Sequence, residues 1–284
     1  MDDYSIYKTQ TRPKTRCSLN YISSYKILGF SFFLFIYFPV VLLSYSSVFA
    51  QNKIDSLNSV LSSLSRRPDS FLNDTTKINM LIMLSRELLV TGNYDKAMEK
   101  VNEAITQAKK QMKGNPTTNL TTLKKGLANA YNIKGNINFA HGNYNEALRN
   151  HFSALNIRVE FGDKSGISSS YNNIGNIYYH QNNDKEALKN YFHSLKIREE
   201  IDDKKGIANS YVTIGNIYYG KAVLLSSDSA FFQSLLYSKA LHNYHAALKI
   251  QEEIGDKNGI ASSLINIGTI NNLLKNLTIQ EIIF

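Results

Sequence analysis

The chain has 284 residues, of which 43% are hydrophobic, and this composition predicts a folded protein of one or two domains. The net charge is +9, but the first 50 residues hold five basic and two acidic side chains, and the remaining 27 basic and 21 acidic residues are interleaved. Nucleic-acid binding needs a dense basic patch, so no nucleic-acid partner is expected. The single cysteine, Cys17, excludes a disulfide framework.

The N-terminal region carries a targeting pattern. Residues 1–26 form a basic leader, and residues 27–50 begin with the apolar run ILGFSFFLFIYFPVVLL and end in Val48-Phe49-Ala50. This order is typical of a secretory signal peptide cleaved after Ala50. The alternative is a membrane anchor, because residues 27–49 are long enough to span a bilayer. Under either interpretation we expect an exported protein, periplasmic or anchored in the cytoplasmic membrane and facing outward.

Residues 51–76 are expected to form a leader segment, with an amphipathic helix from Lys53 to Leu64 and a loop from Arg66 to Asp74. Residues 77–284 contain internal repeats. The segment GDKSGISSSYNNIGNIYY, at 162–179, is matched forty residues later by DDKKGIANSYVTIGNIYY and again at residue 255 by GDKNGIASSLINIGTI. The sequence therefore predicts a domain built from repeated units.

Each unit is predicted to contain two helices. Apolar residues recur at helical spacing from Gly166 to His180 and from Asp184 to Glu200, with Asp184 as an N-cap. Residues 202–206 are expected to form a turn that ends in a helix-stopping glycine, Gly206. The predicted fold is all-α, a solenoid of stacked antiparallel helix pairs with about four full repeats and a partial one.

These units resemble the tetratricopeptide repeat. The residues that occupy its pattern are Tyr171, Ile174, Gly175 and Tyr178 in the first helix and Ala187 and Tyr191 in the second. The forty-residue period resembles the long-repeat type found in exported sensor proteins of the Bacteroidetes type. We expect Gly175 and Gly215 to let the two helices of a unit approach closely, with aromatic rings filling the gaps.

Several features depart from this pattern. The first unit has Ser85 and Val101 where the glycine and the aromatic residue are expected, and the second has Asn138 and His151 at aromatic positions. Residues 221–239 contain thirteen extra residues, which predict two lengthened helices that turn around residues 226–229.

After Gly268 the repeat pattern is lost. A repeat array needs a polar cap, so this end leads us to two hypotheses: that the chain is truncated, and that it self-associates through an uncapped repeat.

Motifs for catalysis or cofactor binding are not found in the sequence, and we expect a protein that is not an enzyme and has no cofactor. His242 and His245 are spaced i, i+3 on a predicted helix, but no third ligand lies nearby in the sequence, so no metal site is expected.

A polar ladder is the candidate site. Asn136, Asn176 and Asn216 follow the packing glycine in three units, Asn132 and Asn172 precede two of them by one helical turn, and Tyr179 and Tyr219 lie three residues further on. The resemblance implies that first helices line a concave groove, where such asparagines grip the backbone of a protein or peptide ligand through amide donors and acceptors. The alternative is that the asparagines bond within the array.

Function is therefore expected to be that of an exported, non-enzymatic scaffold that binds proteins or peptides. The alternative is the sensor region of a truncated signal-transduction histidine kinase or cyclase.

Overall fold

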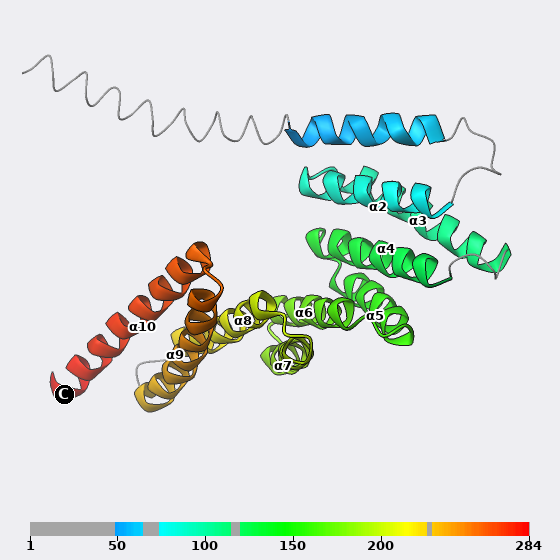
Figure 1. Cartoon of the computed structure of the whole chain (residues 1–284). Coiled ribbons are helices and arrows are strands. Elements are labelled where there is room, and N and C mark those ends of the chain that lie inside the picture. The colour runs from blue at the N-terminus through cyan, green and yellow to red at the C-terminus, as the bar shows by residue number, and fades with distance from the viewer. Residues whose placement is uncertain (1–48, 65–73, 115–119, 226–228, 284) are drawn as a thin grey trace, which may run out of the picture. The chain divides into compact units, whose positions relative to one another are not determined.

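The computed structural model describes residues 49–64, 74–114, 120–225 and 229–283, which form helices and turns with no strand among them (Figure 1). The chain divides into two compact units, Met1–Lys53 and Ile54–Phe284. The second unit holds the repeats. Residues 27–48 of the targeting segment and residues 66–73 of the leader loop lie outside the described residues, whereas the leader helix is present at residues 49–64.

The helices of the repeats follow one another in antiparallel pairs (Figure 1). They are α2 (Asp74–Val90), α3 (Tyr94–Gly114), α4 (Leu120–Ala140), α5 (Tyr144–Glu160), α6 (Lys164–His180), α7 (Asp184–Glu200), α8 (Lys204–Val223), α9 (Ala230–Glu253) and α10 (Lys257–Ile283). Each even-numbered helix from α2 to α8 packs on the helix that follows it, and each pair then contacts the next. This arrangement confirms the predicted all-α array of four helix pairs followed by a single helix.

Left-handed backbone positions make the turns tight. Gly142 has φ +74° between α4 and α5, and Gly162 has φ +71° between α5 and α6. The equivalent turns around α7 place Asn182 (φ 57°) and Asp202 (φ 52°) in the same conformation. Asparagine and aspartate tolerate this region better than other side chains, so the turn geometry survives the loss of glycine.

The helix starts differ from the sequence prediction. Asn183, not Asp184, caps α7, because its side chain accepts a hydrogen bond from the Glu186 amide at 3.2 Å. Asp203 caps α8 in the same way through the Gly206 amide at 2.9 Å. Gly206 therefore lies in the first turn of α8 and does not stop a helix, which corrects the predicted turn over residues 202–206.

A ring lies directly on the packing glycine of each central unit. A Cβ atom added to Gly175 would lie 2.8 Å from Cε1 of Tyr191, and one added to Gly215 would lie 2.7 Å from the same atom of Tyr244. Real Cβ atoms do not approach other atoms this closely, so only glycine fits. The expected close approach of the two helices is confirmed.

Buried and partly buried polar side chains join consecutive units. Nη1 of Arg198, near the end of α7, donates to the Gly206 carbonyl at 2.8 Å and to Oγ of Ser210 at 2.7 Å, both in α8. Arg158 makes the equivalent bonds from α5 to α6. At the α9–α10 junction Gln251 takes the place of the arginine and accepts a bond from Oγ of Ser263 at 2.7 Å. These three junctions, α5–α6, α7–α8 and α9–α10, are thus fixed by directional bonds as well as by apolar packing.

The thirteen extra residues lengthen α8 and α9, as predicted. These helices have 20 and 24 residues, whereas α6 and α7 have 17 each. The added turns carry exposed apolar side chains, including Leu224 (87% exposed) and Phe231 (73% exposed). None of the described helices is both long and apolar enough to cross a membrane.

His151 is the buried counterpart of the two tyrosines. Its ring lies against Gly135, and a Cβ there would be 2.6 Å from Nε2. Burial lowers the pKa of His151 to about 4, and the charge of Arg158 adds to this effect. Nδ1 has no hydrogen-bond partner among the described residues. The folded protein therefore holds a neutral imidazole.

We predict that the bonds of Arg198, and not its bulk, hold α7 to α8. Arg198→Leu removes both donors and should lower the free energy of unfolding by about 2 kcal/mol. Arg198→Gln restores the pairing that Gln251 and Ser263 make, and should recover at least half of that loss. Urea unfolding followed by circular dichroism measures both values, and equal losses in the two variants would contradict the prediction.

We predict that His151 makes the fold sensitive to acid. The pKa of His151 is 6.5 in the unfolded chain and about 4 in the folded protein. Between these two pH values the unfolded state binds a proton that the folded state does not bind, so acid favours unfolding. The neutral histidine therefore makes its full contribution to the free energy of unfolding above pH 6.5. That free energy falls by about 3 kcal/mol as the pH drops to 4.

His151→Tyr, which copies the two later units, should flatten this dependence when thermal unfolding is followed from pH 7 to pH 4. The control is His180→Gln, because His180 is exposed and should leave the wild-type pH dependence in place. A parallel decline in wild type and His151→Tyr would contradict the assignment.

Candidate functional site

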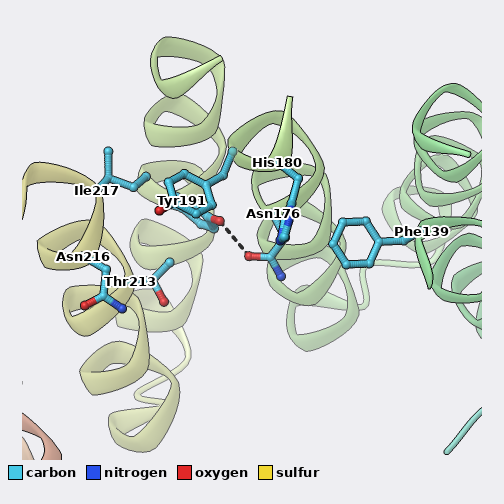
Figure 2. A pocket seen from close by; sticks show the side chains of 8 residues that line it. Phe139, Asn176, His180, Tyr191, Thr213, Asn216 and Ile217 are labelled. Carbon is cyan, nitrogen blue, oxygen red and sulfur yellow. Dashed lines mark hydrogen bonds between the residues drawn. The ribbon is translucent and has the colours of Figure 1, made fainter. Parts of the chain in front are cut away.

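A cavity of about 340 Å³ lies where α4, α6, α7 and α8 meet (Figure 2). It is lined by Phe139, Asn176, Tyr179, His180, Tyr191, Thr213, Asn216 and Ile217. The lining combines aromatic rings with amide and hydroxyl groups, so it can hold a ligand that is partly apolar and can form hydrogen bonds.

The ring-on-glycine contacts also set the hydrogen bonds of this site. The hydroxyl of Tyr191 donates to Oδ1 of Asn176 at 2.6 Å, and that of Tyr244 donates to Oδ1 of Asn216 at 2.7 Å. Burial raises the pKa of both tyrosines, so both hydroxyls stay protonated donors at neutral pH. Each tyrosine thus spans from its own helix to the amide next to the packing glycine.

This bond orients the amide. In Figure 2 the oxygen of Asn176 faces Tyr191 and the amide nitrogen lies on the other side. No bond is recorded from the side-chain nitrogen of Asn176 or Asn216 to the parts of the chain that the structure describes. The cavity therefore carries two N–H donor groups whose orientation is fixed by the fold.

Aromatic residues form the other part of the wall. Phe139 meets His180 edge to face, with ring centroids 4.9 Å apart, and Tyr179 lies 6.0 Å from the same histidine. Tyr179 is 41% exposed, so a ligand can reach it. Phe139 is not among the residues predicted from the sequence, although it precedes Tyr179 by forty residues and is its equivalent in the repeat.

The structure brings three of the seven predicted residues together in the cavity: Asn176, Asn216 and Tyr179. Asn132 instead accepts a bond from Nδ2 of Asn173 at 2.9 Å, which links α4 to α6. Tyr219 lies beside Tyr237, with ring centroids 6.2 Å apart.

Asn136 and Asn172 are partly buried and do not line the cavity. The alternative that the asparagines bond within the array is thus correct for the carbonyl oxygens of Asn132, Asn176 and Asn216.

Metal-binding side chains are scattered. His242 and His245 are both exposed on α9, and across the described ranges no group of three or more histidine, cysteine, aspartate or glutamate residues is placed to hold a metal ion.

The central repeats match a known protein family. The model of the tetratricopeptide repeat matches residues 126–200, which span most of α4 and all of α5, α6 and α7. No curated protein matches the sequence.

Solved structures share the fold at low sequence identity. RapI in its apo form is 18% identical with a TM-score of 0.62, and the alignment covers 80% of this chain and 75% of RapI. A Rap protein complexed with competence and sporulation factor is 15% identical with a TM-score of 0.50, covering 83% of this chain and 74% of that one. BtubC from P. vanneervenii is 14% identical with a TM-score of 0.53, covering 80% and 92%.

At these identities the likeness concerns the fold alone. Together, the family match and the solved structures show that residues 126–200 carry tetratricopeptide repeats and that the chain folds as a helical solenoid of that type.

Proposed function

We propose that the chain is a non-enzymatic scaffold that binds an extended protein or peptide segment in the cavity between α4, α6, α7 and α8. The observation that carries this proposal is the pair of oriented amides on successive units, Asn176 and Asn216, beside exposed aromatic rings. Amide donors suit the backbone carbonyls of a ligand, which every peptide offers whatever its sequence.

The aromatic wall gives this site its selectivity. The edge of Tyr179 and the rings of Phe139 and His180 offer apolar contact to a side chain of the ligand. Aromatic residues contribute large contact areas at low entropic cost, so they are common anchors in binding sites. We expect a ligand with an apolar or aromatic side chain next to two accessible backbone carbonyls.

The fold supports a binding role, since tetratricopeptide arrays are scaffolds and a solved relative in fold is a Rap protein in complex with a factor. Export across the cytoplasmic membrane is part of the proposal and rests on the sequence of residues 27–50. The alternative of a sensor region is not favoured by the family match and the solved structures.

We predict that the amide donors, and not the amide oxygens, bind the ligand. Asn176→Asp keeps an oxygen that can accept from Tyr191 but removes the donors, and Asn216→Asp does the same for Tyr244. The double variant should keep its helical circular dichroism and lose at least about tenfold in affinity. The measurement is binding to an immobilised library of short extended peptides, followed by titration of the best binder.

Tyr191→Phe is the matched control, because it removes the bond that orients the amide of Asn176 but keeps the N–H donors themselves. It should lower stability by about 1 kcal/mol and change affinity far less than the Asp variants do. If Tyr191→Phe alone abolished binding while the Asp variants still bound, the asparagines would be structural and this site would not be the binding site.

A further inference from the structure

The helix α10 is the equivalent of α4, α6 and α8, yet among the described residues no helix covers the face with which those three contact their partners. Gly268 follows Gly215 by the same fifty-three residues that separate the repeats at this point. No atom lies within 4 Å of a Cβ added to Gly268, whereas rings occupy that place at Gly175 and Gly215. The space that an aromatic ring fills beside Gly175 and Gly215 is therefore present beside Gly268, and none of the described residues fills it.

Neighbouring positions on this face are also exposed in α10, although the equivalent positions of α6 and α8 are buried or partly buried. Ala208 of α8 and its equivalent in α6, Ser168, are 1% and 2% exposed, whereas Ala261 of α10 is exposed. Leu264, which takes the place of Tyr211, is 52% exposed. Lys257, Ala261, Leu264 and Gly268 thus form a continuous stripe, which we call the open face of α10.

The open face also carries a charge that the earlier units pair. Lys164 in the first turn of α6 pairs with Glu200 at the end of α7 at 3.0 Å, and Lys204 of α8 pairs with Glu253 of α9. Lys257 occupies the same position in α10, and no ion pair is recorded for it within the described ranges. A helix docked as α7 docks on α6 would bring a carboxylate to Lys257.

The three covering helices share one arrangement of contact residues. An alanine is followed after four residues by the ring and after thirteen by the glutamate: Ala147, His151 and Glu160 in α5; Ala187, Tyr191 and Glu200 in α7; Ala240, Tyr244 and Glu253 in α9. Each of these alanines is fully buried. In the described chain, a helix with this arrangement of alanine, ring and glutamate thus covers the equivalent face of α4, of α6 and of α8.

The chain itself does not turn back to supply such a helix where the repeat would. The helix α6 ends at His180, and the equivalent position in α10 is Leu273. Yet α10 continues without a turn to Ile283. The residues that follow Leu273 therefore extend along the axis of α10 and leave the open face accessible.

We infer that the open face of α10 is a docking site for one amphipathic helix of a partner protein, with an alanine, a tyrosine or histidine four residues later, and a glutamate nine residues after that. The ring sits on Gly268, the alanine packs near Ala261, and the carboxylate pairs with Lys257. This interface continues the α4–α5, α6–α7 and α8–α9 interfaces, and it is separate from the groove ligand of the proposed function.

A fluorescent peptide with the sequence of residues 184–200 is the probe, because it carries Ala187, Tyr191 and Glu200 in the required spacing. Fluorescence anisotropy with the full chain should show saturable binding. In Gly268→Leu the leucine side chain occupies the space that the ring of the peptide needs, so binding should weaken at least about tenfold. This variant should fold normally, because a side chain there meets nothing and leucine favours a helix more than glycine does.

Ser262→Leu is the matched control, because Ser262 is exposed on α10 and its equivalent, Ser169, is exposed in α6. It should bind the peptide as the wild type does. Replacing Tyr191 by alanine in the peptide should abolish binding. Lys257→Glu should weaken binding of the peptide. A peptide that carries Glu200→Lys should bind the Lys257→Glu variant again, because the ion pair is then restored with its charges exchanged.

Two results would overturn the inference. One is that the peptide does not bind the chain, or that it binds Gly268→Leu as tightly as the wild type. The other is a chain that is dimeric in solution and becomes monomeric on Gly268→Leu, because a second copy would then be the occupant. Light scattering of both proteins, alone and with peptide, separates these outcomes.

Discussion

The contact of an aromatic ring with a glycine determines the geometry of each central unit. Tyr191 and Tyr244 lie where a Cβ atom on the facing residue would be, so the two helices of a unit approach more closely than ordinary side chains allow. The close approach lets Ala187 and Ala240 pack with no exposed surface. Since the units stack through these pairs, the distance inside one pair affects the whole array.

The same rings connect stability to the candidate site. A tyrosine that lay further from its glycine could not reach the neighbouring asparagine with its hydroxyl, and the amides of Asn176 and Asn216 would then be free to rotate. Packing therefore fixes the direction of the two donors. A preorganised donor loses less conformational entropy when it binds a ligand than a mobile one does. The groove takes its polarity from contacts that also hold the helices together.

Much of the fold could be predicted from the sequence because its signals repeat. Gly175 recurs forty residues later, and the pair Ala187 and Tyr191 recurs fifty-three residues later with the same spacing, so the helix pairs and their contact follow from the pattern. The N-cap could not be predicted as well, since Asn183 and Asp184 are both good caps and only the backbone conformation decides between them. The cavity was also harder to predict, because it combines α4, α6, α7 and α8, and no local pattern states which residues of different helices meet.

The units differ in the residue that meets the packing position, and this difference distributes function along the array. The first unit has Ser85 and Val101 at the glycine and ring positions, and neither carries a ring. The second pairs Gly135 with His151, whose Nδ1 bonds to nothing in the described chain. Only the third and fourth units carry tyrosines that bond an asparagine, and these two units, together with Phe139 of the second, line the cavity. Oriented donors are thus confined to the units in which a tyrosine meets a glycine, so the position of the groove follows from the residues at one repeat position.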